Sequence, residues 1–263
     1  MDLRLHDEKA FVSGSTQGIG YAIAAQLAAE GAKVTLNGRT AERVDAAVER
    51  LRGEQPRARV SGLAADFADA GEVARLSDAL GDVDILVNNV GLFGLADFAS
   101  ISDEDWARYF DVNVMSGVRL SRAVLGGMLA RGSGRIIFIS SESGVNVPAD
   151  MVHYGTTKAA MIALGNGLAK LTRGTAVTVN TVLGGPTFSD GVAASVAAVA
   201  EAQGLPAEAM KSAIIGQNHT TLLQRFIDPT EIASLVAYLS SPLSSATNGA
   251  ALRADGGVLT GML

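Results

Sequence analysis

Residues 9–31 read KAFVSGSTQGIGYAIAAQLAAEG and set the pattern for the whole chain. The apolar run Lys9–Ser13 predicts a buried strand, and the alanine-rich stretch that continues to Glu30 predicts a helix. Between them, the three glycines of SGSTQGIG allow a tight turn and a close approach of the backbone to a pyrophosphate at the start of the helix. A plain tight turn also fits the glycine spacing, but the strand before it and the helix after it favour nucleotide binding.

Strand and helix patterns alternate along the rest of the chain. Further strands are predicted at residues 33–37, 57–65, 84–87, 135–139, 175–182 and 250–253, and capping residues predict helix starts at Thr40, Asp69, Ser102 and Asp228. Because the strands are almost continuously apolar, they indicate an α/β fold: a doubly wound parallel sheet in three layers, with helices on both faces. We find no linker and no internal repeat, so residues 1–263 are predicted to form a single domain. Residues 187–225 lack clear periodicity and are expected to form a mobile substrate cover.

The composition excludes several classes of protein. The chain has 263 residues, of which 48% are hydrophobic, a net charge of −6 and no cysteine. The negative charge argues against nucleic acid or an anionic membrane as the partner, and the lack of cysteine excludes disulfides and thiolate nucleophiles. The longest apolar segment of low charge, residues 192–200, is too short to cross a membrane, and the first ten residues show no secretory signal. We therefore expect a soluble cytoplasmic protein.

The stretch 139–160, ISSESGVNVPADMVHYGTTKAA, carries the residues with chemical potential. Tyr154 and Lys158 are four residues apart on a predicted helix and therefore lie on one face. A nearby ammonium favours the phenolate and is expected to lower the pKa of Tyr154 from its ordinary value of about 10. Ser141, at the end of a predicted strand, can hydrogen-bond a substrate oxygen while Tyr154 moves a proton. A solvated helix face is the other interpretation of the Tyr-Lys pair alone.

The end of the second predicted strand bears on the choice of cofactor. An acidic residue at this place holds the 2′-hydroxyl of NAD, whereas an arginine accommodates the 2′-phosphate of NADP. The sequence reads Asn37-Gly38-Arg39, which favours NADP(H) and leaves NAD(H) possible. An ordinary surface charge in a turn is the alternative for Arg39.

Two polar sites lie among apolar residues. Asn88 to Gly91 follow the fourth strand, where they can meet a ribose or form an asparagine-rich turn. Asn113 lies near the start of a long helix predicted over Asp111–Arg131, between valines. An asparagine inside a helix is unfavourable unless it has a task, either in catalysis or as a satisfied interior amide.

Taken together, SGSTQGIG, NNVG, Asn113, Ser141 with Tyr154-x-x-x-Lys158, and GGPT resemble the short-chain dehydrogenase/reductase family in its single-domain, 3-oxoacyl reductase-like form, over essentially the whole chain. The resemblance implies a Rossmann-like sheet and NAD(P)-dependent hydride transfer. It implies catalytic roles for Asn113, Ser141, Tyr154 and Lys158, in which Tyr154 is the general acid/base and Asn113 holds a water of the proton relay. The residues expected to bind the cofactor are Gly14, Thr16, Gln17, Gly18, Ile19, Gly20, Arg39, Asp66, Phe67, Asn89, Val90, Gly91, Tyr154, Lys158 and Thr187.

Three positions depart from the pattern of the family. Val90 replaces the usual alanine of NNAG, Gly184 replaces the usual proline before the glycine of the turn, and Gln17 stands where NADP-preferring members often carry a basic residue. A 2′-phosphate would therefore depend mainly on Arg39.

The sequence leaves the substrate open. The predicted function is NADP(H)-dependent hydride transfer to or from a carbonyl or secondary alcohol; NAD-dependent alcohol oxidation and a non-catalytic nucleotide sensor are the alternatives. Neighbours of the motifs fit either an apolar pocket for a lipophilic carbonyl or core packing; they are Leu92, Phe93, Met151 and Phe188. His6, His153 and His219 have no metal-ligand spacing, so no metal is expected. By the resemblance, the helices at 111–131 and 151–173 would form an interface of a homotetramer or dimer.

Overall fold

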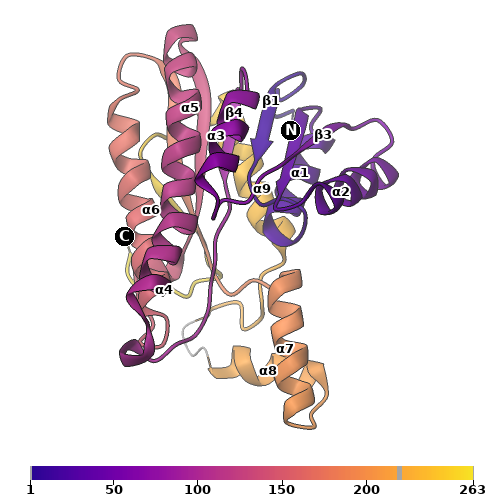
Figure 1. Ribbon diagram of the computed structural model, residues 1–263, viewed down its shortest axis with the longest axis vertical. Coiled ribbons are helices and arrows are strands. Elements are labelled where there is room, and N and C mark those ends of the chain that lie inside the picture. Colours follow the sequence, from indigo (N-terminus) through magenta and orange to yellow (C-terminus); the bar gives the residue numbers. More distant parts are fainter. Residues whose placement is uncertain (1, 218–220, 263) are drawn as a thin grey trace.

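The computed structural model describes residues 2–217 and 221–262, and its strands form one parallel sheet in the order β3-β2-β1-β4-β5-β6-β7 (Figure 1). The strands are β1 (Lys9–Val12), β2 (Lys33–Gly38), β3 (Arg59–Ala64), β4 (Ile85–Asn88), β5 (Ser133–Ser141), β6 (Ala176–Gly184) and β7 (Ala251–Ala254). The helices are α1 (Gly18–Ala29), α2 (Ala41–Glu54), α3 (Ala70–Ala79), α4 (Asp103–Phe110), α5 (Ser116–Arg131), α6 (Val152–Lys170), α7 (Asp190–Ala202), α8 (Ala207–Gln217) and α9 (Pro229–Ser240). The predicted fold class is confirmed, as are the predicted strands.

Helices cover both faces of the sheet, which makes the three layers (Figure 1). One apolar cluster joins the sheet to α1, α2 and α9, and the other joins its opposite face to α3, α5 and α6. The strands read as continuous apolar runs because both of their faces are buried.

Side chains that cap the helices fix where they begin. Thr40 and Asp69 accept hydrogen bonds from the third backbone amide of α2 and α3, as the sequence predicted. Asp228 and Glu231 form a reciprocal capping box around Pro229 at the start of α9. Each cap satisfies amides that the helix itself leaves without a partner.

The predicted helix at 111–131 begins differently from the expectation. Asp111–Met115 form a π-helical turn that connects α4 to α5, so the regular α-helix begins only at Ser116. Such turns insert one residue and are frequent at functional sites. Here the turn directs Asn113 inward, and none of its side chain is exposed.

Helices α7 and α8 stand away from the sheet (Figure 1). The sequence predicted only short helical patches there, whereas the structure has two helices that share a small apolar cluster of Val196, Ala200 and Met210. The role of 187–225 as a substrate cover and the single-domain organisation stay predictions, and His219 lies outside the described residues. Within the part of the chain that the structure describes, no helix is long and apolar enough to cross a membrane.

Candidate active site

The glycine-rich turn lies where the strand order reverses. β1 pairs with β2 on one side and with β4 on the other, so a crevice opens at the carboxyl ends of β1 and β4. Gly14 has a φ of 61°, which only glycine adopts freely. A Cβ at Gly20 would come within 2.5 Å of Asn89 Nδ2 and would also collide with the Gly14 carbonyl oxygen. Glycines therefore set the shape of this turn.

Two asparagines hold the turn in place. Asn37, at the end of β2, accepts a hydrogen bond from the Gly14 amide at 3.0 Å and donates to the Leu63 carbonyl oxygen at 3.0 Å. Asn89 donates to the carbonyl oxygens of Ser13 and Gly14 at 3.0 and 2.9 Å. The amide groups thus fix the turn from both neighbouring strands.

A cavity of about 460 Å³ extends from this turn across the strand ends. Its lining includes every predicted cofactor residue except Tyr154, Lys158 and Thr187: Gly14, Thr16, Gln17, Gly18, Ile19, Gly20, Arg39, Asp66, Phe67, Asn89, Val90 and Gly91. Thr187 is buried and donates to the Gly185 carbonyl oxygen at 2.8 Å. The glycine-lined turn at the start of α1 fits a dinucleotide, because the backbone amides at a helix N-terminus favour a phosphate.

Two arginines line the same cavity near the end of β2. Arg39 follows the strand and Arg43 lies in the first turn of α2, and both side chains are exposed. Among the residues that the structure describes, neither guanidinium forms an ion pair. The sequence analysis missed Arg43, although its spacing of four residues from Arg39 could have indicated it.

A carboxylate from α7 reaches the glycine-rich turn. Asp190 Oδ2 accepts a hydrogen bond from the Gly18 amide at 2.6 Å. This amide is one of the donors at the start of α1 that have no partner within the helix, and a helix N-terminus favours an anion. Asp190 therefore links the α7–α8 pair to the turn, a contact that no sequence pattern indicated.

Ser141, Tyr154 and Lys158 converge beside the cavity. Ser141 ends β5, and α6 brings Tyr154 and Lys158 to the same place, with the Lys158 ammonium 5.6 Å from the centre of the Tyr154 ring. Lys158 Nζ donates to the Ile139 carbonyl oxygen at 2.9 Å and would lie 3.3 Å from a Cβ at Gly91. Lys158 thus lies between the Ser-Tyr pair and the cavity. Only 5% of Lys158 is exposed, so the other interpretation of the Tyr-Lys pair, a solvated helix face, is wrong.

Burial has the largest effect on the pKa values of Tyr154 and Lys158. Desolvation lowers the pKa of Lys158 to about 8, against the opposing effect of the Glu142 carboxylate. Desolvation also raises the pKa of Tyr154 above its ordinary value; the nearby Ser141 hydroxyl opposes this rise, and the Glu142 charge adds to it. The sequence predicted a lowered pKa for Tyr154, and this prediction is wrong for the free protein, because burial raises the pKa and it is the Ser141 hydroxyl that opposes the rise.

Asn113 joins two segments of the chain through its side-chain hydrogen bonds. Its Oδ1 accepts from the Leu92 amide at 2.6 Å, and its Nδ2 donates to the Leu92 carbonyl oxygen at 3.0 Å and to Thr157 Oγ1 at 2.9 Å. The interior amide is thus satisfied, and it ties the segment after β4 to α6. Its role in holding a water stays a prediction.

Glu142 is a further residue of the site that the sequence analysis missed. Its carboxyl group hydrogen-bonds Ser141 Oγ and lies 3.3 Å from Ser143 Oγ. Desolvation raises the pKa of Glu142, although hydrogen bonds from Ser141 and Ser143 oppose the rise. An acidic residue directly after Ser141, at the end of an apolar strand, was the available signal.

The proposed pocket-lining residues divide into two groups. Leu92 and Phe93 line the cavity, and 52% of the Phe93 side chain is exposed, so core packing does not account for it. Phe188 instead packs against Phe226, with 5.5 Å between ring centres. Met151 precedes α6 and does not line this cavity.

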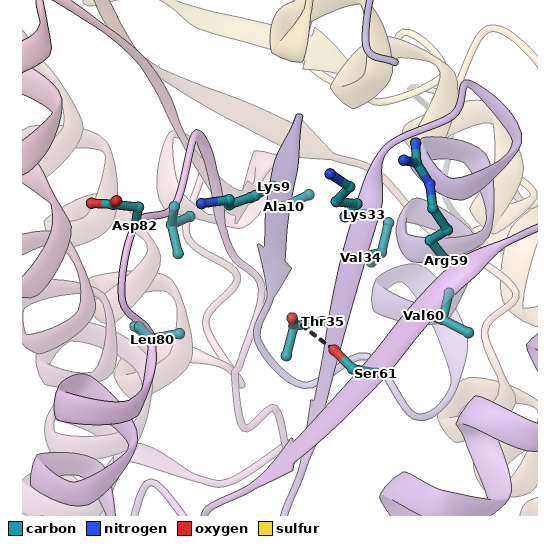
Figure 2. Close-up of a pocket in the computed structure, with 11 residues that line it drawn as sticks. Lys9, Ala10, Lys33, Val34, Thr35, Arg59, Val60, Ser61, Leu80 and Asp82 are labelled. Carbon is teal, nitrogen blue, oxygen red and sulfur yellow. Dashed lines mark hydrogen bonds between the residues drawn. The ribbon is translucent and has the colours of Figure 1, made fainter. Parts of the chain in front are cut away.

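A second hollow of about 350 Å³ lies at the amino ends of β1, β2 and β3, away from the groups described above (Figure 2). Lys9, Lys33 and Arg59 lie around it, and Thr35 Oγ1 and Ser61 Oγ are 3.1 Å apart in a hydrogen bond across its floor. Asp7 pairs with both Lys33 and Arg59. Because ligands of open α/β sheets bind at the carboxyl ends of the strands, the other cavity is the better candidate site. Within the described residues, no three His, Asp or Glu side chains are grouped to hold a metal.

Comparisons with known proteins identify the family and the relatives of the chain. Residues 8–200 match the family model described as short chain dehydrogenase. Uncharacterized oxidoreductase YvaG of Bacillus subtilis (strain 168) is 44% identical over 260 residues, with 98% of each chain covered. The 3-oxoacyl-[acyl-carrier-protein] reductase FabG of Vibrio cholerae is 32% identical over 261 residues, covering 97% of this chain and 99% of that one.

Among solved structures, L-sorbose reductase from Gluconobacter frateurii, complexed with NADPH and L-sorbose, superimposes with a TM-score of 0.94. It is 29% identical, and the match covers 100% of both chains. The likeness therefore extends through α7 and α8 as well as the sheet.

Proposed function

The chain belongs to the short-chain dehydrogenase/reductase family, and we propose that it is an NADP(H)-dependent oxidoreductase that acts on a small carbonyl compound or the corresponding secondary alcohol. The observation that carries the proposal is the convergence of Ser141, Tyr154 and Lys158 beside the glycine-lined cavity. A nucleotide sensor has no need for these three groups in one place, so we favour an enzyme.

In this proposal each side chain has one task. The nicotinamide, when bound, supplies or takes the hydride. Ser141 donates a hydrogen bond to the substrate oxygen and fixes its position, and Tyr154 gives that oxygen a proton in reduction or takes one in oxidation. Lys158, held by the Ile139 carbonyl oxygen, places its ammonium between Tyr154 and the cavity. A positive charge there favours the phenolate as the proton leaves.

The two cavity arginines support the preference for NADP(H). Arg39 and Arg43 lie where the second strand ends, which is where the adenosine ribose is expected, and the strand end has no acidic residue. Guanidinium groups match phosphate oxygens in geometry and charge. The NADPH complex of the sorbose reductase relative supports the same choice. NAD(H) use is the alternative that affinity measurements decide.

Turnover with a panel of substrates tests the proposal. The purified protein is mixed with NADPH and, in turn, with keto sugars, 3-oxoacyl thioesters and ring ketones, and the nicotinamide absorbance is followed. We expect loss of absorbance with at least one class. Tight NADPH binding without turnover on any substrate, in either direction, would favour the nucleotide sensor instead. Cytoplasmic location and a homotetramer or dimer through α5 and α6 stay predictions, the latter open to sedimentation analysis.

A further inference from the structure

The carboxyl group of Glu142 lies within hydrogen-bonding distance of the serine that is to bind the substrate oxygen. Glu142 begins a 3₁₀ turn (Glu142–Gly144) directly after β5, and this turn bends its side chain back onto Ser141. Ser141 is 7% exposed and Ser143 is 4% exposed. Glu142 itself is half-buried, so the Glu142–Ser141 contact is partly shielded from water. In such surroundings a polar group without a hydrogen-bond partner costs more free energy than in water.

The number of protons limits what Ser141 can do. A serine hydroxyl has one hydrogen and two lone pairs. One lone pair of Ser141 Oγ already accepts from the Ser143 amide at 3.1 Å. If Glu142 is ionised, the bond between the two side chains must use the Ser141 hydrogen, and Ser141 has nothing left to donate to a substrate. If Glu142 is protonated, it donates to the second lone pair, and the Ser141 hydrogen is released for the substrate oxygen.

We propose that Glu142 is a positioning residue, which orients the Ser141 hydroxyl toward the substrate only while its own carboxyl group is protonated. The inference rests on the proposed function, because it needs Ser141 to donate to a reacting carbonyl. The protonated state is needed in both directions, since reduction and oxidation pass through the same transition state. Ser141 Oγ then makes all three of its hydrogen bonds at once: from Ser143, from Glu142 and to the substrate.

The surroundings of Glu142 decide how easily it holds the proton. The 3₁₀ turn packs against α6 and β6. From α6, Lys158 and Tyr154 face the carboxyl group, and their pKa values respond to its charge. Residues 181–184 of β6 are Thr, Val, Leu and Gly, and none of them titrates. Desolvation, which raises the pKa of Glu142, is thus opposed by hydrogen bonds from Ser141 and Ser143.

The test compares wild type with Glu142→Gln over a range of pH. The glutamine amide has the shape of the protonated carboxyl group and donates at every pH. For carbonyl reduction, the ratio of kcat/KM for wild type over the variant is expected to fall as pH rises, approaching tenfold per pH unit once Glu142 ionises. Loss of the Glu142 charge also lowers the pKa of Tyr154, but this effect weakens the variant at high pH and moves the ratio the opposite way.

Two further measurements keep the test decisive. Glu142→Ala lacks both the charge and the donor. Like Glu142→Gln, it should not show the fall in kcat/KM that ionisation of Glu142 causes in wild type. Its kcat/KM should also be lower than that of Glu142→Gln at every pH, because no side chain then orients Ser141. Infrared difference spectra of wild type against Glu142→Gln should contain a protonated-carboxyl band that disappears over the pH range of the kinetic step, and this needs no substrate. Melting temperatures and NADPH affinity show whether the variants are folded.

A ratio that is constant or rises with pH, or spectra without the band, would overturn the proposal. Such results leave the proposed function intact if wild type turns over and needs Tyr154. A wild-type protein without any turnover contradicts the proposed function instead, and the infrared experiment then tests Glu142 alone.

Discussion

Two regions of the molecule are built in contrasting ways. One is the edge of the sheet at the carboxyl ends of the strands, which holds the candidate active site, and the other is the α7–α8 pair opposite it. At the edge, Asn37, Asn113 and Lys158 are at most 5% exposed, and each makes specific hydrogen bonds. Among the residues that the structure describes, the α7–α8 pair buries a small apolar cluster of its own. Elements with few buried contacts open at lower free energy than the core. The contrast indicates a preformed candidate site beside a separately packed, more easily displaced pair of helices.

Few contacts connect the two regions. Asp190 accepts from the Gly18 amide, Thr187 pairs with Ile227 in an isolated bridge, and Phe188 packs on Phe226. All three of these contacts are made by residues at the start of the 187–225 segment. The segment therefore joins the edge near its first residues, where a bound cofactor is expected to lie.

A methyl group in the glycine-rich turn should give the largest loss. Gly20→Ala places a Cβ within 2.5 Å of Asn89 Nδ2, so the turn must shift, and we expect NADPH affinity to fall at least about 100-fold, with a loss of stability of about 1–3 kcal/mol. Calorimetric titration and denaturant unfolding measure the two effects. The matched control is Gly53→Ala in α2, where a Cβ meets nothing within 4 Å; it should keep affinity and gain up to about 1 kcal/mol. Equal behaviour of the two variants would contradict a rigid edge.

Lys158→Met should stabilise the free protein in a pH-dependent way. The pKa of Lys158 is about 8 in the folded state and 10.5 ordinarily, so burial of its ammonium costs roughly 3 kcal/mol at neutral pH. As pH rises past about 8 the folded lysine loses its proton and this cost shrinks, and above 10.5 it is gone, because the unfolded lysine is then neutral too. Urea unfolding between pH 7 and 10 should show the advantage of the variant decreasing; a constant difference would contradict the burial of a charge.

Replacement of both cavity arginines should separate the two cofactors. In the Arg39→Ala/Arg43→Ala variant we expect the Kd for NADPH to rise about 10–100-fold, since a charged hydrogen bond contributes about 1.5–3 kcal/mol, while the Kd for NADH changes little. Fluorescence titration gives both constants, and the exposed Arg57→Ala is the control. Equal weakening for both cofactors would favour the NAD-dependent alternative.

The smallest effect is expected where the two regions meet. Asp190→Asn removes a negative charge from the start of α1 but keeps a side-chain oxygen for the Gly18 amide, so NADPH affinity should rise by a few-fold. Glu201→Gln, at the far end of α7, removes an equal charge away from the turn and should leave the affinity unchanged. If both variants behaved alike, the Asp190 contact would have no part in cofactor binding.

Much of the edge could be predicted from the sequence because its signals are local. The strand, the glycine-rich turn and the helix are adjacent in the chain, and each parallel strand delivers its last residues to the same side of the sheet. Tyr154 and Lys158 share a helix face by spacing alone. For these residues, chain order and periodicity are nearly enough to predict where the side chains lie.

The rest depended on tertiary packing. The π-turn around Asn113 and the contact of Asp190 with Gly18 join segments that spacing does not connect. The direction of the Tyr154 pKa was wrong for the free protein because the sequence shows the lysine but not the burial. Glu142 was missed because a single acidic residue after a strand usually faces solvent, whereas here the 3₁₀ turn bends it inward.

The most direct test of the central claim is Tyr154→Phe, assayed for both NADPH binding and carbonyl reduction. The phenol is the proposed proton donor, and its hydroxyl lines no part of the glycine-rich cavity. We predict that the Kd for NADPH stays within about threefold of wild type while kcat falls about 10²–10⁴-fold, the usual contribution of a general acid. A variant that binds NADPH and reduces the substrate at the wild-type rate would contradict the account.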